Sequence, residues 1–311
     1  MRVAILGAGA VGGYYGGVLA RAGHRVVMLA RGAHLEALRK RGIEIRTPEG
    51  TFFAAVDAVA DPRELGAAEL AVVAVKNYSL AEISPAVRLV AEAGATVLPL
   101  LNGVEVVDRL AAAGVPAGQV LGGLSEISAA RIGPGLVERR SPFQRVVLGE
   151  TAGGTSERAE RIAAAFRQAG VDCKVSDDIA VDIWRKFAFI TAMAAACGLA
   201  RSPVGPIRET PLGHLLIERA VGEVVAVARA RGIALPGGAE EQIVRVIDSM
   251  PAAMKPSFLL DFESGGPTEL DDLCGAVSRL ARPAAVETPI HDTATAALGI
   301  ALGVSPSSRA G

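Results

Sequence analysis

The stretch Val3-Ala4-Ile5-Leu6-Gly7-Ala8-Gly9-Ala10-Val11-Gly12 decides the fold. Four apolar residues predict a short buried strand, and a helical pattern over residues 10–22 follows at once. The glycines between them have the spacing GxGxxG. Gly7 permits a tight turn, Gly9 lets the backbone approach a pyrophosphate, and Gly12 lets the helix pack close to the sheet. The residues predicted to bind the phosphates of a dinucleotide, at the N–H groups that open the helix, are Gly7, Ala8, Gly9, Ala10, Val11 and Gly12.

Further apolar runs alternate with helical patterns through the first half of the chain. Residues 25–29, 70–75 and 95–99 are typical of buried strands, and residues 81–92 of a helix. Strands separated by helices predict βαβ units and a parallel sheet. Glycine pairs and short apolar runs over residues 122–149 predict a hairpin-bearing extension of this sheet.

The second half carries helical patterns and no strand signal after about residue 175. Glycine and proline separate helices predicted at 177–199, 211–231, 238–250, 268–282 and 289–302. We therefore expect an α/β protein with a Rossmann-type dinucleotide-binding domain over residues 1–176 and an all-helical domain over residues 177–311. The polar tail 305–311 is expected to fray.

The composition excludes several classes of protein. The 311 residues are 50% hydrophobic and 21% charged, with a net charge of −1. Disorder requires low hydrophobicity and high net charge, so a folded chain is expected. A nucleic-acid binder normally shows a strongly basic domain, and stacking platforms need more than the 4% of aromatic residues present here. No nucleic-acid partner is expected.

Metal, disulfide and membrane signals are also absent from the sequence. The three cysteines lie far apart with no CxxC pair, and the four histidines have no ligand spacing. Each cysteine is expected to be a small buried side chain in a reducing compartment. The apolar stretch over residues 187–200 is shorter than the ~20 residues that span a bilayer. We expect no metal, no membrane association and a cytoplasmic location.

Three polar residues follow predicted strands, where an open α/β sheet binds its ligands. Sites for NAD carry an acidic residue at the end of the second strand, but here Arg31 stands at that point. Its guanidinium can pair with a 2′-phosphate, which favours NADPH/NADP+ over NAD(H), although a solvated surface arginine is the alternative. Lys76 follows the third strand and Asn102 the fourth, and Asn102-Gly103 is also an ordinary turn dipeptide.

Lys186 occupies the apolar stripe of a predicted helix. It shares that face with Ile190, Met193, Ala194 and Cys197. A lysine there either extends its head group to water or is held desolvated in a cleft. Desolvation would lower its pKa and make it a proton donor near neutrality. The alternative is that Lys186 only ends the stripe near the start of the helix.

Two shorter patterns lie further along. Ser257 and Asp261 are four residues apart and can share a helical face. Thr268 followed by an acidic residue at Asp271 matches a helix start, and carboxylates are favoured there in any case. That pattern alone gives Glu269 a sufficient structural explanation.

Taken together, the motifs resemble the ketopantoate reductase (2-dehydropantoate 2-reductase) family over nearly the whole chain. The set that carries the resemblance is the glycine motif, Arg31, Lys76, Asn102-Gly103, Trp184-Arg185-Lys186, Ser257 with Asp261, and Thr268-Glu269-Leu270-Asp271. The resemblance implies an NADP-dependent oxidoreductase acting on CH–OH groups, which reduces ketopantoate to pantoate in pantothenate biosynthesis. It also implies a helical domain closing over the Rossmann domain, with the active site in the cleft.

The resemblance further assigns roles to individual residues. It implies that Lys186 is the general acid, that Asn102 contacts cofactor and substrate, and that Ser257 helps to hold the substrate. Glu269 is placed in the catalytic site near the cofactor, and Arg31 and Lys76 on the cofactor's phosphate and ribose side. A cationic lysine would stabilise charge on the carbonyl oxygen and then deliver the proton.

One departure from the family pattern concerns the substrate. The pattern has asparagines four and eight residues after the lysine, where this chain has Ile190 and Ala194. A pocket built to hydrogen-bond a polar substrate discriminates strongly, and an apolar one does not. We expect Ile190 and Ala194 to face a more apolar or differently shaped 2-oxo acid, or a related ketone.

Two other functions stay open from the sequence. One is another dinucleotide enzyme, such as a 3-hydroxyacid or opine-type dehydrogenase. The other is a non-catalytic NADP(H)-binding protein. The apolar helices of the second half could also bury the interface of a homodimer.

Overall fold

A computed structural model describes residues 1–303 and divides the chain into two compact units. The first unit comprises Met1–Leu101 and Glu105–Asp182. The second comprises Asn102–Val104 and the chain from Ile183 onward. The tail predicted to fray, residues 305–311, lies outside the described residues. The change of unit falls inside one helix, after Asp182.

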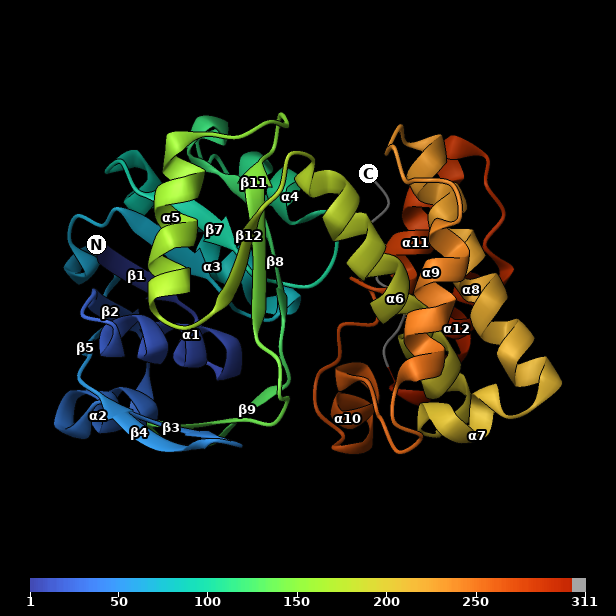
Figure 1. The fold of residues 1–311 in the computed structure, drawn as a ribbon, viewed down its shortest axis with the longest axis horizontal. Coiled ribbons are helices and arrows are strands. Elements are labelled where there is room, and N and C mark those ends of the chain that lie inside the picture. The colour runs from blue at the N-terminus through green and yellow to red at the C-terminus, as the bar shows by residue number, and fades with distance from the viewer. Residues whose placement is uncertain (304–311) are drawn as a thin grey trace. The chain divides into compact units, whose positions relative to one another are not determined.

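A five-stranded parallel sheet forms the centre of the first unit (Figure 1). Its strand order is β5-β2-β1-β6-β7, and each strand pairs in parallel with its neighbours. The strands are β1 (Arg2–Leu6), β2 (Arg25–Leu29), β5 (Asp57–Val59), β6 (Leu70–Val73) and β7 (Thr96–Pro99). Strands predicted at 25–29, 70–75 and 95–99 are confirmed, and the Rossmann-type fold class with them.

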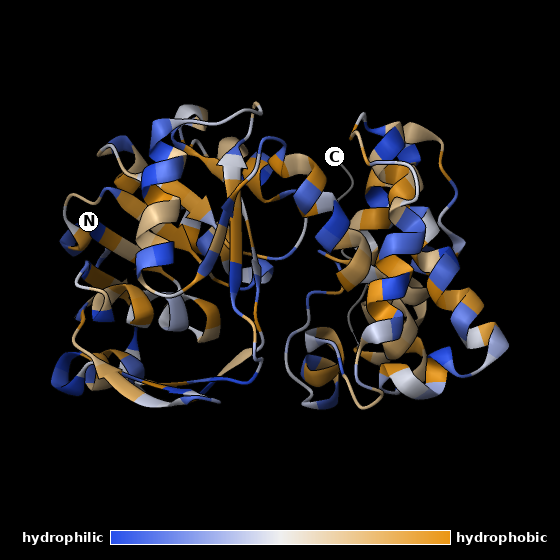
Figure 2. Cartoon of the chain, viewed as in Figure 1, coloured by the Kyte–Doolittle hydropathy of each residue, from blue (hydrophilic) through white to orange (hydrophobic). Residues whose placement is uncertain are grey.

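Both faces of this sheet are buried, which explains why its strands are continuous apolar runs. Val3 and Ile5 of β1 belong to one hydrophobic core, and Ala4 and Leu6 belong to a second core on the other face. Figure 2 shows these strands as apolar segments. The helices of this unit are α1 (Ala10–Arg21), α2 (Gly32–Arg41), α3 (Leu80–Glu92), α4 (Val106–Ala112) and α5 (Glu157–Gln168).

Two smaller sheets complete the first unit. One has the order β4-β3-β10-β9 and the other β12-β11-β8. Their strands are β3 (Ile43–Thr47), β4 (Gly50–Ala54), β8 (Leu121–Glu126), β9 (Ala129–Gly133), β10 (Leu136–Arg139), β11 (Arg145–Glu150) and β12 (Asp172–Val175). The single-turn 3₁₀ helices of this unit are η1 (Pro62–Leu65), η2 (Asn77–Ser79) and η3 (Ala117–Gln119).

The hairpin predicted within residues 122–149 is present as the antiparallel pair β9–β10. The prediction that this region extends the parallel sheet is wrong, because its strands lie in the two smaller sheets. An isolated bridge between Val97 and Val120 links it to β7. Pro99 ends β7 and has no N–H to continue a ladder. Gly123 packs against this end instead, where a Cβ would lie 2.6 Å from the Pro99 carbonyl oxygen.

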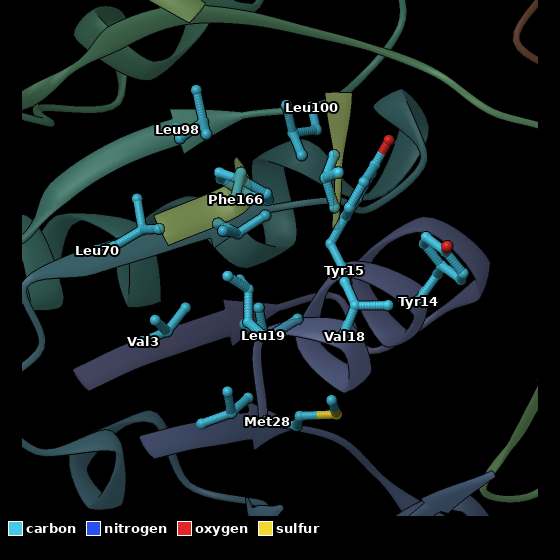
Figure 3. Close-up of a cluster of buried hydrophobic side chains, with 14 of the residues drawn as sticks. Val3, Tyr14, Tyr15, Val18, Leu19, Met28, Leu70, Leu98, Leu100 and Phe166 are labelled. Atoms are coloured by element: carbon cyan, nitrogen blue, oxygen red, sulfur yellow. The ribbon is translucent and has the colours of Figure 1, made fainter. Parts of the chain in front are cut away.

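Helix α1 lies between the five-stranded sheet and the four-stranded sheet. A Cβ at Gly16 would lie 2.5 Å from Met28 of β2, on one side of the helix. A Cβ at Gly17 would lie 2.9 Å from Ile45 of β3, on the other side. Figure 3 shows part of the core that α1 forms with the central strands. The glycines of α1 thus let two sheets approach one helix.

The second unit is helical. Its elements are most of α6 (Ile179–Ala200), then α7 (Val204–Arg208), α8 (Pro211–Ala230), α9 (Ala239–Ser249), α10 (Ser257–Glu263), α11 (Cys274–Ala281), η4 (Arg282–Ala284) and α12 (Pro289–Ala301). Within residues 1–303, α6 alone is long and apolar enough to cross a membrane by length and composition. Of its most apolar window, 61% is buried inside the structure, as in the core helix of a globular domain.

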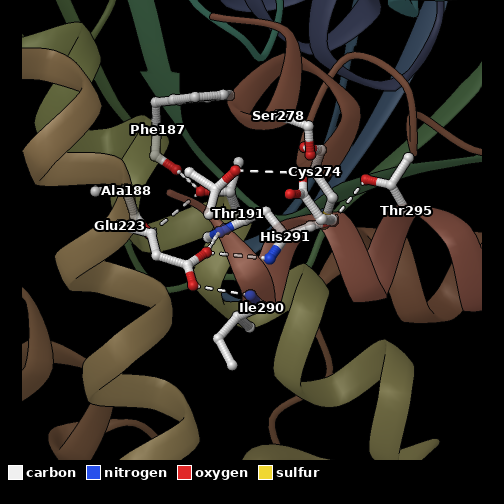
Figure 4. A network of polar contacts seen from close by, with 11 residues as sticks. Phe187, Ala188, Thr191, Glu223, Cys274, Ser278, Ile290, His291 and Thr295 are labelled. Atoms are coloured by element: carbon white, nitrogen blue, oxygen red, sulfur yellow. Dashed lines mark hydrogen bonds and ion pairs between the residues drawn. The ribbon is translucent and has the colours of Figure 1, made fainter. Parts of the chain in front are cut away.

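A buried hydrogen-bond network joins α8 to the start of α12 (Figure 4). Glu223 accepts hydrogen bonds from the backbone N–H groups of Ile290 and His291, at 2.8 and 3.1 Å. Its carboxylate also lies 2.6 Å from Nδ1 of the fully buried His291. The carboxylate satisfies two of the N–H groups that a helix start leaves unpaired. The buried Glu223 therefore has a structural role at the start of α12.

The three cysteines are free and buried, as predicted. Burial raises the pKa of Cys173, Cys197 and Cys274 to about 12. Their thiols are therefore protonated and unreactive near neutral pH.

Candidate active site

The first unit presents one edge at which a ligand is expected. Strand β1 is flanked by β2 on one side and β6 on the other, so the chain order reverses between β1 and β6. Open α/β sheets bind ligands outside the carboxyl ends of the strands at this point. The glycine motif follows β1 here, and the segment leading to Lys76 follows β6.

The three motif glycines meet different constraints. Gly7 has φ +105°, and a Cβ on it would lie 2.8 Å from the carbonyl carbon of Ala74. A Cβ on Gly12 would overlap the carbonyl oxygen of Gly7. A Cβ on Gly9 would meet no atom within 4 Å. Fold geometry therefore explains Gly7 and Gly12, whereas the space at Gly9 is open.

The start of α1 has the properties of an anion site. Gly9 is its N-cap, no side chain caps its N–H groups, and no acidic residue lies in its first turn. Free N–H groups and the helix dipole both favour a negative group there. The open space at Gly9 and this helix start fit the pyrophosphate of a dinucleotide.

Arg31 and Lys76 lie beyond the strand ends, as predicted. Arg31 is exposed at the N-cap of α2, and its Nη1 lies 2.5 Å from a carboxylate oxygen of Glu82 in the first turn of α3. Exposed ion pairs of this kind contribute little free energy, so the guanidinium is available for exchange to a phosphate. Lys76 is half-buried at the N-cap of η2.

The second unit brings three predicted site residues together. Lys186 of α6 donates from Nζ to Oδ1 of Asn102 at 3.0 Å. Asn102 in turn donates from Nδ2 to Oε2 of Glu269 at 3.3 Å. Asn102 belongs to this unit, although it follows β7 of the first. The group therefore runs from an ammonium through an amide to a carboxylate.

The chemistry of these groups fixes the orientation of the amide. An ammonium can only donate, so the amide oxygen must face Lys186. An ionised carboxylate can only accept, so the amide nitrogen must face Glu269. The carboxylate thus holds Asn102 in the orientation that receives the lysine. Such an arrangement can present an N–H group of Lys186 to a developing oxyanion.

The predicted helix start at Thr268 is wrong, and this changes the meaning of Glu269. Helix α11 begins at Cys274, with Leu273 as its N-cap, so Thr268 caps no helix. The helix predicted at 268–282 is correspondingly shorter. Glu269 is 4% exposed and hydrogen-bonds to Asn102. An acidic side chain in the first turn of a helix would normally be solvated. The burial of Glu269 therefore indicates that it belongs with Asn102 and Lys186.

The remaining predicted substrate residues occupy different environments. On α6, Ile190 is half-buried and Ala194 is fully buried. Ser257 is exposed at the first residue of α10, with Asp261 half-buried on the same helix. Within residues 1–303, Ser257 forms no hydrogen bond to Lys186.

One residue near the glycine motif escaped the sequence analysis. His34, in the first turn of α2, is 6% exposed, and its Nε2 lies 2.7 Å from the carbonyl oxygen of Ala8. Its Nδ1 accepts the backbone N–H of Gly135 at 2.9 Å. Burial lowers the pKa of His34, against a smaller opposing effect of the bond to Ala8. No local pattern marks such a residue, because its partners are distant in sequence.

The described residues contain no group of three or more histidine, cysteine or acidic side chains able to hold a metal ion.

The glycine geometry generates a prediction that separates folding from binding. We expect Gly9→Ala to unfold at the wild-type temperature but to weaken dinucleotide binding at least about tenfold, because a methyl group fills space that only a ligand needs. We expect Gly12→Ala to lower the free energy of unfolding by about 1–3 kcal/mol through overpacking. Thermal unfolding and NADPH titration measure both. Equal destabilisation by the two substitutions would contradict this interpretation.

The comparisons with known proteins cover nearly the whole chain. The family described as ketopantoate reductase PanE/ApbA matches residues 3–153, and its C-terminal domain matches residues 178–301. A 2-dehydropantoate 2-reductase of Halobacterium salinarum is 34% identical, over 94% of this chain and 96% of that protein. An uncharacterized oxidoreductase of Bacillus subtilis is 33% identical, over 96% of this chain and 98% of that protein.

A solved structure agrees with these sequence matches. The crystal structure of 2-dehydropantoate 2-reductase from Geobacter metallireducens superposes with a TM-score of 0.89 at 30% identity, covering 97% of this chain and 100% of that one. The two family matches, the sequence relatives and the solved structure all indicate the same family. The chain belongs to the ketopantoate reductase family.

Proposed function

We propose that this protein is an NADPH-dependent reductase of a 2-oxo acid, with Lys186 as its general acid. The observation that carries the proposal is the hydrogen-bonded group of Lys186, Asn102 and the buried Glu269. Family membership supports pyridine-nucleotide-dependent reduction of a ketone, and relatives are named 2-dehydropantoate 2-reductases.

The residues of the first unit would hold the cofactor. The open space at Gly9 and the uncapped start of α1 suit the pyrophosphate. Arg31 would exchange its bond to Glu82 for a bond to the 2′-phosphate, and Lys76 would add a second positive charge. When bound, the reduced nicotinamide supplies a hydride to the ketone carbon.

The residues of the second unit would handle the carbonyl oxygen. Lys186 donates an N–H to that oxygen as negative charge develops, and then transfers the proton. Asn102 keeps the lysine nitrogen in place through its amide oxygen. Glu269 keeps the amide from turning over, because the reversed amide would set its oxygen against a carboxylate.

The proposal that the substrate has an apolar side chain rests on Ile190. It lies one helical turn beyond Lys186 and is half-buried, where the family pattern has an asparagine. Ala194 is fully buried and adds no polar group. An apolar wall beside the acid favours a 2-oxo acid with an apolar side chain, since no amide is present at these positions to pair with a hydroxyl.

The cofactor assignment predicts a selective effect at Arg31. Arg31→Ala should weaken NADPH binding about 10- to 100-fold, because charged hydrogen bonds to the 2′-phosphate are lost. NADH binding should change less than about twofold, because NADH has no group there. The control is Arg63→Ala, which removes an exposed arginine paired with Asp61 in the same unit. An unchanged preference between the two cofactors in Arg31→Ala would refute the assignment.

The mechanism predicts that Lys186→Ala lowers kcat about 10²- to 10⁴-fold while NADPH still binds. Assays of NADPH oxidation measure kcat, and fluorescence titration measures NADPH binding separately. Lys255→Ala is a matched control, since Lys255 is a lysine of the same unit that pairs with Glu263 at the surface. Undiminished turnover in Lys186→Ala would rule the mechanism out, and binding without turnover in the wild type would favour a non-catalytic NADP(H)-binding protein.

The substrate proposal predicts the outcome of NADPH oxidation against a panel of 2-oxo acids. A 2-oxo acid with an apolar side chain should exceed ketopantoate in kcat/KM by at least about tenfold, and Ile190→Asn should narrow that ratio. A kcat/KM for ketopantoate far above all the others would show instead that ketopantoate is the substrate.

A further inference from the structure

His34 connects three segments of the first unit that are far apart in sequence. The ring belongs to α2, its Nε2 meets the carbonyl oxygen of Ala8 in the glycine motif, and its Nδ1 meets the N–H of Gly135 in the turn between β9 and β10. The ring is 6% exposed, so water does not compete freely for either bond. These contacts lie within one compact unit.

The hydrogen bond to Gly135 fixes the protonation state of the ring. A backbone N–H can only donate, so Nδ1 must carry a lone pair and no proton. The ring proton of a neutral imidazole then lies on Nε2, which donates it to Ala8. Burial lowers the pKa of His34 from 6.5, which keeps the ring neutral at physiological pH.

The bond to Ala8 determines where the next amide points. The peptide between Ala8 and Gly9 is planar and trans, so its C=O and N–H point in opposite directions. Holding the carbonyl oxygen against His34 therefore aims the N–H of Gly9 away from the ring. Gly9 is the N-cap of α1, and the space beside its Cα is open. The loop can thus keep an N–H donor directed outward before any anion arrives.

The turn between β9 and β10, which contains Gly135, holds the ring of His34 in place. Gly135 has φ +68°, and a Cβ on it would lie 3.1 Å from Ala37 of α2, so this turn packs closely on the helix that carries His34. The carbonyl of Gly135 also accepts the N–H of Glu44 at 2.8 Å, which ties the turn to β3. The imidazole is therefore anchored from one side and acts on the glycine loop from the other.

We propose that His34 is a positioning residue that pre-orients the glycine loop for the cofactor's phosphates through its Nε2–H bond to Ala8. The inference rests on the proposed binding of NADPH at that loop. His34 touches neither the cofactor nor the substrate in this role, so it should affect cofactor affinity and leave kcat at saturating NADPH unchanged.

Two amide substitutions separate the two bonds of the ring. The nitrogen of a glutamine side chain reaches the position of Nε2, so His34→Gln keeps a donor for Ala8. The oxygen of an asparagine reaches the position of Nδ1, so His34→Asn keeps an acceptor for Gly135 and loses the donor. His34→Met has a bulky side chain without an N–H and serves as a second variant that lacks the donor.

The experiment is NADPH titration by fluorescence, with kcat and thermal unfolding measured on the same proteins. We expect Kd for NADPH to rise about tenfold in His34→Asn and His34→Met and to stay within about twofold of wild type in His34→Gln. Values of kcat at saturating NADPH should agree within about twofold. His24→Asn is the matched control, because His24 lies at the opposite end of β2 and bonds to the amino group of Met1.

The outcomes distinguish the inference from the proposal beneath it. If the wild type binds NADPH and the three substitutions change Kd alike, or change only the unfolding temperature, His34 is a structural residue and the inference is overturned. If the wild type binds no NADPH, the proposed function is wrong and the inference falls with it. If His34→Asn does not fold, His34→Met against His34→Gln decides the question.

Discussion

The first unit depends on how closely α1 approaches the strands on both of its sides. Glycines repeat four residues apart along two faces of this helix, so that Gly12 and Gly16 face the parallel sheet while Gly13 and Gly17 face the four-stranded sheet. Even a methyl group at any of these four positions would meet a neighbour at 3.0 Å or less. This close packing, together with the buried Tyr15 and Leu19 of the same helix, positions the helix start and with it the glycine loop.

Much of the central sheet could be predicted because its strands are apolar on both faces. Strands β1, β2, β6 and β7 consist mostly of short continuous apolar runs, the pattern of strands that are buried on both faces. The strands β3 and β4 escaped prediction because neither is a continuous apolar run: β3 alternates apolar with charged or polar residues, and β4 begins with glycine and threonine. Helix α2 escaped for a similar reason: half of its residues are charged or histidine, and its apolar face is narrow.

The candidate site was predictable only where local patterns carry it. The glycine spacing and Lys186 on an apolar helix are visible within a dozen residues. The bonds from Lys186 to Asn102 and from Asn102 to Glu269 span 84 and 167 positions, so no periodicity records them, and family resemblance alone linked the three residues. Local reasoning also misjudged Glu269, because a helix-start pattern at Thr268 is satisfied by a turn. His34 shows the same limit, since a lone histidine has no spacing to read.

Under the proposed mechanism, the bond between Lys186 and Asn102 has a consequence for repeated turnover. A protonated primary amine has three hydrogens, and after giving one away it still has two. The amide oxygen can therefore keep its hydrogen bond whether the nitrogen is charged or neutral, and the nitrogen need not move between cycles. Recharging then requires only a proton from solvent, with no rotation of the amide and no rearrangement of the backbone that carries it.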